Sequence, residues 1–232
     1  CDFPTGCITL QGGSVTALPG FDEGLFYVQD RAARTAVEIA APRAGMRVLD
    51  ACSAPGGKAF SAAVRMKNSG EILACDIQEK KLAFIRQGAE RLGIDIIRTE
   101  ARDARCGDAA LENVFDVVIA DVPCSGLGVI RKKPEIRCKS ENEIAPLPAI
   151  QRDILASLSC FVKPGGTLLY STCTVLECEN EAVVNEFLES HDNYSPEPFA
   201  LGTKLIESGM HTFFPNTDGT DGFFAERLKR IK

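Results

Sequence analysis

Residues 48–58 read Val48-Leu49-Asp50-Ala51-Cys52-Ser53-Ala54-Pro55-Gly56-Gly57-Lys58. The apolar start predicts a buried strand, the paired glycines predict a tight turn, and the residues after them predict a helix. Open α/β sheets bind nucleotide-like cofactors at junctions of this kind. The segment has neither the GxGxxG pattern of dinucleotide-binding dehydrogenases nor the GxxxxGK pattern, followed by Ser or Thr, of phosphate-binding loops. The expected cofactor therefore need not carry a pyrophosphate.

Strands and helices alternate along most of the chain. We expect strands at residues 25–28, 47–50, 71–75, 94–98, 115–120 and 167–171, and helices at residues 30–41, 56–66, 78–92, 149–161 and 177–189. Such alternation is typical of an α/β fold with a doubly wound, mostly parallel sheet. Two apolar and aromatic runs, 210–214 and 222–228, predict a hairpin that closes the sheet with one antiparallel C-terminal strand. An interrupted strand pair is expected around Gly12-Gly13.

The size and composition favour one catalytic domain with a small extension. A chain of 232 residues that is 45% hydrophobic can bury a complete core. We place an N-terminal extension of short strands and a helix at residues 1–41 and the catalytic domain at residues 42–232. No run approaches the roughly 20 apolar residues of a membrane span. The ten cysteines come without a signal peptide or a CxxC pair, so we expect a cytoplasmic protein without membrane contact.

The charge of the chain bears on its partners. A formal net charge of −6 is unexpected for a protein that binds nucleic acid, because clustered Lys and Arg normally contact the phosphates. Either a basic face is local, or another part of a longer protein supplies it, and the start at Cys1 indicates a fragment. The run Arg131-Lys132-Lys133-Pro134-Glu135-Ile136-Arg137 is the best local candidate for phosphate contact. Arg31 and Arg34 could extend the same surface.

Acidic residues follow three successive strands. Asp50 and Asp76 end the first two strands of the alternating region, and Asp103 comes just after the third. The carboxyl ends of parallel strands share one edge of a sheet, so these carboxylates are expected near the glycine-rich turn. Asp76 is placed to hydrogen-bond ribose hydroxyls, and Asp103 is placed to meet an adenine amino group. An adenosine with a short charged tail fits this description, which predicts S-adenosylmethionine as the cofactor and no metal.

Two cysteines lie in short polar turns that each follow an apolar run. The two segments are Asp121-Val122-Pro123-Cys124-Ser125-Gly126 and Ser171-Thr172-Cys173-Thr174. Thiols at such places are exposed for chemistry and, beside a methyl-donor site, indicate methyl transfer through a covalent cysteine adduct. In that scheme a thiolate adds to C6 of a cytosine, C5 becomes nucleophilic, and Asp121 holds N3 and the exocyclic amine. Chemistry alone leaves open whether Cys124 or Cys173 attacks C6.

Four motifs occur in order along the chain. They are DACSAPGGK at 50–58, DVPCSGLGVIRKKPEIR at 121–137, STCTVLECENE at 171–181 and DGFF at 221–224. These motifs resemble those of the RNA cytosine-C5 methyltransferase family, above all its bacterial members that act on small-subunit ribosomal RNA, from about Gly20 to the C-terminus. The resemblance implies a Rossmann-like, S-adenosylmethionine-dependent methyltransferase fold. It also implies methyl transfer to C5 of a cytosine in RNA, expected to be 16S ribosomal RNA, through a covalent bond between a cysteine and C6.

The resemblance also assigns residue roles. The family's nucleophile, in its STC segment, matches Cys173, and the cysteine of its DxPCS segment, which helps to release the product, matches Cys124. The family's cofactor contacts carry over onto Cys52, Ser53, Ala54, Pro55, Gly56, Gly57, Lys58, Asp76, Asp103 and Asp121. Departures are small, since Ser53 stands where Ala is usual and Cys138 stands at a loop position that is often aromatic or basic. The family's usual N-terminal RNA-binding helical domain has no counterpart in this chain.

Three other functions fit parts of the pattern. The same chemistry could act on tRNA or another RNA. A methyltransferase for exocyclic amines needs no thiol and usually has an aromatic residue after its proline turn, which Val122-Pro123-Cys124 lacks. A non-catalytic RNA-binding relative is disfavoured because Cys124, Cys173 and Asp121 are all present.

Overall fold

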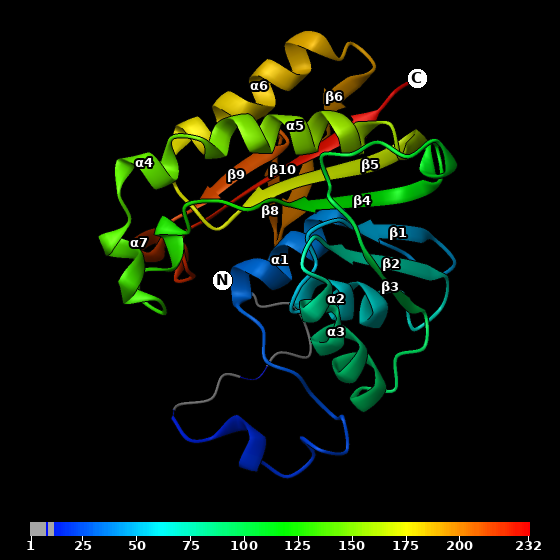
Figure 1. Cartoon of the computed structure of the whole chain (residues 1–232), viewed down its shortest axis with the longest axis vertical. Helices are drawn as coiled ribbons and strands as arrows, with labels where there is room; N and C mark the ends of the chain where they lie inside the picture. Colours follow the sequence, from blue (N-terminus) through cyan, green and yellow to red (C-terminus); the bar gives the residue numbers. More distant parts are fainter. Residues whose placement is uncertain (1–7, 9–11) are drawn as a thin grey trace.

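The computed structural model describes residue 8 and residues 12–232. In this part of the chain one large sheet has the strand order β3-β2-β1-β4-β5-β10-β6, and β9 also pairs with β10 (Figure 1). Its strands are β1 (Arg47–Asp50), β2 (Glu71–Asp76), β3 (Ile97–Ala101), β4 (Phe115–Asp121), β5 (Val162–Thr172), β6 (Tyr194–Pro196), β9 (Met210–Phe213) and β10 (Phe223–Arg230). A small separate sheet pairs β7 (Phe199–Leu201) with β8 (Lys204–Ile206).

Helices cover both faces of the large sheet (Figure 1). The α-helices are α1 (Arg31–Ala40), α2 (Gly57–Arg65), α3 (Glu79–Arg91), α4 (Glu141–Ile144), α5 (Leu147–Ser159), α6 (Glu181–Ser190) and α7 (Pro215–Asp218). Short 3-10 helices are η1 (Val15–Ala17), η2 (Ala109–Leu111), η3 (Leu127–Val129), η4 (Pro134–Cys138) and η5 (Glu177–Glu179). Across the described residues, every helix is too short or too polar to cross a bilayer.

The sheet has the predicted strand directions. Strands β1 to β5 pair in parallel, whereas β10 runs antiparallel to β5, with Phe224 opposite Thr172 and Leu228 opposite Leu168. The predicted C-terminal hairpin is also present, because β9 and β10 pair with Phe213 opposite Phe223. The α/β class, the mostly parallel sheet and the antiparallel C-terminal strand are therefore confirmed.

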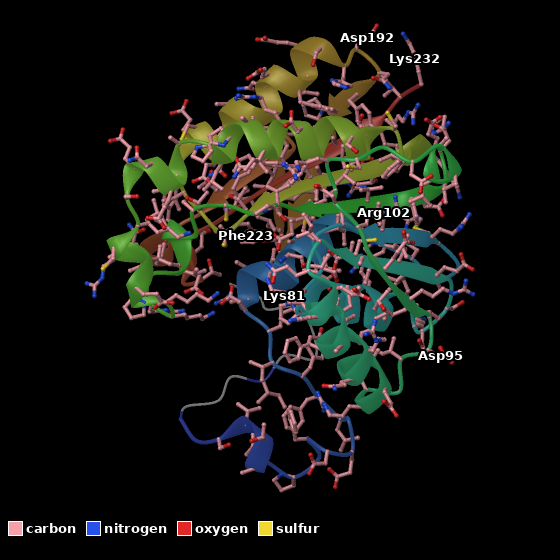
Figure 2. The ribbon with its side chains drawn as sticks, in the orientation of Figure 1. Lys81, Asp95, Arg102, Asp192, Phe223 and Lys232 are labelled. Atoms are coloured by element: carbon pink, nitrogen blue, oxygen red, sulfur yellow. The ribbon has the colours of Figure 1, made fainter. Side chains whose placement is uncertain are left out.

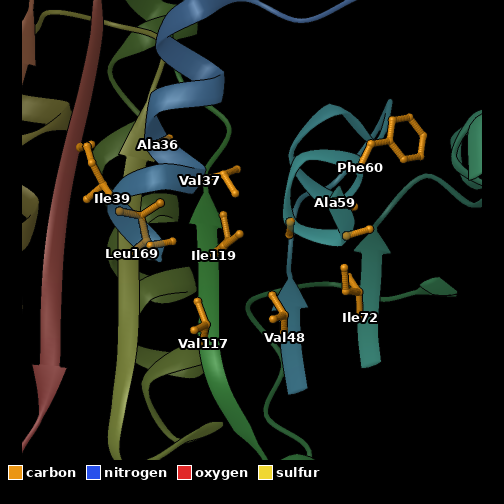
Figure 3. Packing of buried hydrophobic residues seen from close by; sticks show 14 of the residues in the cluster. Ala36, Val37, Ile39, Val48, Ala59, Phe60, Ile72, Val117, Ile119 and Leu169 are labelled. Carbon is orange, nitrogen blue, oxygen red and sulfur yellow. The ribbon is translucent and has the colours of Figure 1, made fainter. Parts of the chain in front are cut away.

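Alternating side chains divide the core between the two faces of the sheet. Val48 of β1 and Ile119 of β4 pack with α1, α2 and α3, whereas the adjacent Leu49 and Val118 pack with α5 and α6. Figure 3 shows Val48 and Ile119 on the same side as Val37 of α1. These strands are buried on both faces, which explains their nearly continuous apolar sequences.

Local signals predicted some boundaries correctly and misplaced others. The side chain of Asp30 accepts a hydrogen bond from the backbone N–H of Ala32 at 2.8 Å, so α1 begins where the sequence predicts. The predicted strand at 94–98 is observed three residues later, as β3. The predicted helix at 177–189 divides into η5 and α6 at Asn180, whose φ of −116° and ψ of −104° are not helical.

The strand predicted at residues 25–28 is wrong. Leu25 is 78% exposed and Val28 is 67% exposed, so their apolar side chains are not half-buried in a sheet. The backbone carbonyls of Phe21 and Phe26 instead accept hydrogen bonds from the guanidinium of Arg91 in α3. Of the strand pair expected at residues 5–16, residues 5–7 and 9–11 lie outside the described residues, and Val15 and Thr16 belong to the 3-10 helix η1 instead of a strand. The division of the chain at residues 41 and 42 stays a prediction.

Candidate active site

Polar residues gather where neighbouring parallel strands end. Asp50, Asp76 and Asp121 are the last residues of β1, β2 and β4, and Cys173 directly follows β5. Ligands of open α/β sheets bind outside the carboxyl ends of the strands. This edge of the sheet is therefore the candidate active site.

The two cysteines of the polar turns are in contact. Sγ of Cys124 lies 3.2 Å from Sγ of Cys173, and the backbone N–H of Cys173 donates to Sγ of Cys124 at 3.3 Å. The hydrogen bond with the Cys124 thiol lowers the pKa of Cys173, although burial opposes this change. The same hydrogen bond and burial raise the pKa of Cys124 well above its usual value. A thiolate is therefore favoured on Cys173.

Lys58 and Asp121 form an ion pair beside the cysteines. Nζ of Lys58 lies 2.6 Å from Oδ2 of Asp121, and Oδ1 of Asp121 accepts a hydrogen bond from the hydroxyl of Ser171 at 2.9 Å. Burial would lower the pKa of Lys58, but the attraction of Asp121 and its hydrogen bond raise it, so the amine stays charged. The positive charges of Lys58 and Lys133 also contribute to the lowered pKa of Cys173.

A buried network of hydrogen bonds holds the turn of Cys124. The carboxylate of Glu179 is fully buried and accepts from the backbone N–H of Ser125 at 2.9 Å and from the amide of Gln151 at 2.8 Å. The same Gln151 amide donates to the carbonyl of Pro123 at 3.0 Å. Glu179 therefore fixes the backbone on both sides of Cys124.

The turn of Cys173 is tied into the same region. Asn180 accepts a hydrogen bond from the hydroxyl of Thr172 at 2.6 Å and donates to the carbonyl of Thr174 at 3.2 Å. The hydroxyls of Thr174 and Ser125 are 2.9 Å apart, which joins the two turns directly. Sequence reasoning missed Glu179, Asn180 and Gln151. Two of them stand in the STCTVLECENE motif, at the start of the helix expected at residues 177–189.

A cavity of about 490 Å³ opens over the two thiols. It is lined by Cys124 and Cys173, by Ile136 on its apolar side, and by the ammonium-bearing side chains of Lys133 and Lys139. Lys139 also donates to the carbonyl of Ser125 at 2.7 Å. Glu135 and Glu143 also line it, so its charges balance, and an opening of this size suits a flat polar ring.

Residues 51–56 connect β1 to α2, and their backbone is held by the two strand-end aspartates. The hydroxyl of Ser53 donates to Asp50 at 2.7 Å, and the backbone N–H of Ala54 donates to Asp76 at 3.3 Å. Asp76 also accepts from the backbone N–H of Gln78 at 2.9 Å. The bond between Ala54 and Pro55 is cis.

The glycines bring the turn to the start of α2. Gly56 has a φ of +108°, and a Cβ there would meet the ring of Phe60 at 2.7 Å, so a side chain is excluded. Gly57 begins α2, and its carbonyl accepts from the Gln29 amide at 3.0 Å. The N-cap Gly56 has no side chain to cap this helix, so the first backbone N–H groups of α2 can bind an anionic ligand.

Two further residues lie at the edge of the predicted cofactor site. Cys52 is half-buried, and burial together with the nearby Asp121 raises the pKa of its thiol, so it is a neutral lining residue. Asp103 follows β3, and its carboxylate is held by Arg105, with Oδ2 2.6 Å from Nη2. The predicted roles of Cys52 to Lys58, Asp76, Asp103 and Asp121 in cofactor binding stay predictions.

Arg131 and Lys132 of the basic run 131–137 form ion pairs within the domain. Asp221, which is 2% exposed, accepts from Arg131 at 2.9 Å and lies 2.6 Å from the ammonium of Lys132. Lys132 also pairs with Asp30, the N-cap of α1. These pairs fasten the loop after Cys124 to the rest of the domain, and within the run Lys133 lines the cysteine cavity.

Known proteins of similar sequence identify the family of this chain. Residues 37–229 match the family model for the 16S rRNA methyltransferase RsmB/F. The chain belongs to this family. It is 37% identical to a probable ribosomal RNA small subunit methyltransferase B of Bacillus subtilis, over 99% of this chain and 53% of that protein. It is also 37% identical to a ribosomal RNA small subunit methyltransferase B of Erwinia tasmaniensis, over 93% of this chain and 49% of that protein.

Solved structures of other proteins share the fold. The crystal structure of NSun6 from Pyrococcus horikoshii with SFG superposes with a TM-score of 0.85 at 28% identity, over 95% of this chain and 57% of that chain. A methyltransferase homolog of Pyrococcus horikoshii gives a TM-score of 0.81 at 29% identity, over 97% of this chain and 74% of that chain. The RsmB/F chain described here spans about half the length of the curated relatives it matches.

Proposed function

We propose that this RsmB/F chain transfers a methyl group from S-adenosylmethionine to C5 of a cytosine in RNA, with 16S ribosomal RNA as the substrate. The observation that carries the proposal is the contact between Cys124 and Cys173, 3.2 Å apart, beside the ion pair of Lys58 and Asp121. A methyltransferase for amines or hydroxyls has no use for two thiols at the carboxyl edge of the sheet.

The chemistry begins with Cys173. Its thiolate adds to C6 of the cytosine, which places electron density on C5 because the ring becomes an enamine. Asp121 lies beside the thiols, and its carboxylate accepts a hydrogen bond from the exocyclic amine as the ring gains electron density. Lys58 keeps that carboxylate in place and charged.

The second half of the reaction restores the aromatic ring. When bound, S-adenosylmethionine supplies an electrophilic methyl group, which C5 of the adduct accepts. A base then removes the C5 proton, and the electrons of that bond expel the Cys173 thiolate from C6. Cys124 keeps its thiol proton, because its pKa is raised, and its Sγ hydrogen-bonds Cys173, so it can give that proton to the departing Cys173 sulfur, and we assign it to product release.

The cofactor proposal rests on the groups around the turn after β1. The N-terminus of α2 suits a carboxylate, while the buried carboxylate of Asp50 suits an ammonium group. Asp76 ends β2 where ribose hydroxyls bind in folds of this kind. A zwitterionic amino acid joined to a nucleoside meets all three requirements.

The substrate proposal rests on the family. The name of the family includes 16S rRNA, and the relatives are named for the small ribosomal subunit. The cysteines of the described residues form no disulfide, which fits a reducing cytoplasm. Methyl transfer to tRNA by the same chemistry is the alternative, which the experiment must distinguish from methyl transfer to 16S ribosomal RNA.

The deciding experiment supplies the protein with isotopically labelled S-adenosylmethionine and either 16S ribosomal RNA or total tRNA, each from cells that lack this enzyme. Mass spectrometry of the digested nucleosides should find label in 5-methylcytidine from 16S RNA only. Label in tRNA would show that tRNA is the substrate instead. Label in N4-methylcytidine would contradict the cysteine chemistry.

A further inference from the structure

A second, larger cavity lies on the α1 face of the sheet. It is an open groove of about 1040 Å³ with walls from α1, the end of α2, the β7–β8 hairpin, β9 and β10, which can be followed in Figure 1. Its charged lining includes Arg31, Arg34, Glu38, Arg65, Lys204 and Arg227, and we call it the basic groove. The groove and the cysteine cavity have separate sets of lining residues in the described part of the chain.

The basic groove has a local excess of positive charge. Among the described residues, five Arg and Lys side chains line it, against the two carboxylates of Glu38 and Asp218, and Arg227 also pairs with Glu197 beside the groove at 2.8 Å. This excess stands in a chain whose formal net charge is −6. The lining includes Arg31 and Arg34, which the sequence analysis named for this role, whereas the run 131–137 lies outside the groove and its phosphate contact stays a prediction.

Two arginines of the groove share one acceptor. Glu38 takes a hydrogen bond from Arg65 and also pairs with Arg34 at 2.8 Å, so two guanidiniums meet a single carboxylate. Nε of Arg34 and Nε of Arg65 are buried and have no acceptor within the described residues. Burial lowers the pKa of Arg65, and the positive charges of Arg34 and Arg227 lower it further. An added anion beside these guanidiniums would relieve this repulsion.

The shape of the groove favours a strand over a small anion. Lys204 stands on the β7–β8 hairpin and Arg31 on the opposite wall, at the start of α1. Apolar side chains lie between the charges, including Val64, which is 54% exposed, and the partly buried Leu201. Alternating guanidinium, ammonium and apolar surfaces suit phosphates together with the sugars and bases that join them.

The groove is adjacent to the active-site turns. Thr220 lines the groove, and two residues later the backbone N–H of Gly222 donates to the carbonyl of Gly128 at 2.9 Å. The N–H of Gly128 in turn donates to the carbonyl of Cys173 at 3.0 Å. The wall between the groove and the catalytic thiolate is therefore only a few residues thick.

We propose that the basic groove binds the phosphate backbone of the RNA strand whose cytosine enters the cysteine cavity, an inference that rests on the proposed function. The Arg and Lys side chains contact phosphates on nucleotides flanking the target. Such contacts carry no base specificity, so the groove should bind RNA of any sequence.

The test uses a 12-nucleotide oligouridylate, which contains no cytosine and so measures the groove apart from the chemistry. Its affinity for the protein is measured by fluorescence anisotropy at several salt concentrations. The variants are Lys204→Glu, Arg65→Gln and the double variant, and the control is Lys232→Glu. Lys232 is exposed at the C-terminus, beyond the end of β10 opposite to Phe223 (Figure 2).

We expect each substitution that removes one phosphate interaction to weaken binding about fivefold at 0.1 M salt and to make the salt slope shallower by about 0.7. Lys232→Glu should bind like the unaltered protein. Equal affinity of the groove variants and this control would overturn the proposal, as would an unaltered protein that binds no oligouridylate. If Arg65→Gln is found unfolded by circular dichroism, Lys204→Glu on the exposed hairpin decides alone.

A methylation assay separates this proposal from the function on which it rests. With a cytosine-containing RNA, the groove variants should show a raised KM and an unchanged kcat. If the unaltered protein binds oligouridylate through the groove but forms no 5-methylcytidine, the groove stands and the proposed function fails. If it methylates RNA while the groove variants keep the original KM, the function stands and the groove proposal fails.

Discussion

Nζ of Lys58 and Oδ2 of Asp121 are 2.6 Å apart although 63 residues separate them in the chain. Lys58 comes from the first turn of α2 and Asp121 from the end of β4, so only the parallel packing of β1 beside β4 brings them together. The ion pair holds a carboxylate next to two thiols without exposing an uncompensated charge, since Lys58 neutralises it.

Replacing Lys58 should change the titration of Cys173. The Lys58 charge is one of the causes that lower the pKa of the Cys173 thiol, so Lys58→Met should raise this pKa. The rate of Cys173 alkylation by iodoacetamide, followed against pH by peptide mass spectrometry, should shift to higher pH. Lys58→Arg keeps the charge and serves as the control. An identical alkylation profile in Lys58→Met would show that the ammonium does not act on the thiolate.

Removal of the Asp76 carboxylate should weaken cofactor binding. Asp76→Ala is expected to cost about 1–3 kcal/mol of binding free energy for S-adenosylmethionine, the range for leaving a buried hydrogen-bonding partner unsatisfied. Isothermal titration calorimetry measures the change. Asp95→Ala is the matched control. Asp95 is exposed and lies just before the amino end of β3, away from the edge where the strands end (Figure 2). Unchanged affinity in Asp76→Ala would remove Asp76 from the site.

Glu179 should matter for stability as well as for chemistry. Glu179→Ala leaves the N–H of Ser125 and the amide of Gln151 without their acceptor, at about 1–3 kcal/mol for each buried donor. Urea unfolding should show this loss. Glu177 lies on the same turn but is exposed, so Glu177→Ala should change the unfolding free energy by less than about 0.5 kcal/mol. Equal losses in the two variants would mean that the network does not hold the Cys124 turn.

Asp50 should make the stability of the cofactor-free protein depend on pH. Burial raises the pKa of Asp50 to about 7, from 3.8. The folded state therefore binds this proton more tightly than the unfolded chain, and the resulting stability is full below pH 3.8 and lost as the pH rises through 7. The loss is up to roughly 4 kcal/mol, at about 1.4 kcal/mol per pKa unit.

The measurement for Asp50 is the free energy of unfolding at pH 5 and pH 8 without cofactor. The unaltered protein should lose stability between these values, and Asp50→Asn, which cannot ionise, should lose distinctly less. Glu226, whose pKa burial raises to about 8, contributes in the same direction and remains in both proteins. The same pH dependence in both proteins would show that Asp50 is ionised throughout.

Features that depend on neighbours in sequence could be predicted. The Asp30 cap, the glycine turn after β1 and the antiparallel C-terminal hairpin follow from local patterns, and the parallel order of strands places Asp50, Asp76 and Asp121 at one edge. The two polar turns predict that Cys124 and Cys173 share a site, and the fold brings their sulfur atoms into contact.

Features that depend on tertiary contacts could not be predicted. The segment 25–28 has the composition of a strand. In the fold, the carbonyls of Phe21 and Phe26 instead accept hydrogen bonds from Arg91, which comes more than 60 residues later in the chain. Glu179 lies at the start of a predicted helix, and nothing in the neighbouring sequence shows that its carboxylate is buried and hydrogen-bonded to Gln151 and Ser125. Of the groove arginines, the sequence singled out Arg31 and Arg34 of α1, whereas Arg65 of α2 and Arg227 of β10 join them only in the fold.

The two cysteines are best distinguished by the covalent complex that each variant forms. Cys173→Ala lacks the thiolate that adds to C6, so it should form no adduct and transfer no methyl group. Cys124→Ala keeps that thiolate but loses the partner assigned to release. Protein and RNA should therefore accumulate as a covalent complex when S-adenosylmethionine is present. The double variant should form none.

The division of labour, in which Cys173 attacks C6 and Cys124 releases the product, is tested by denaturing electrophoresis. Each variant is incubated with labelled substrate RNA and S-adenosylmethionine before it is denatured. We expect an RNA–protein band that survives denaturation in Cys124→Ala and is absent in Cys173→Ala. A persistent band in Cys173→Ala and none in Cys124→Ala would contradict these assignments, because the roles of the two thiols would then be reversed.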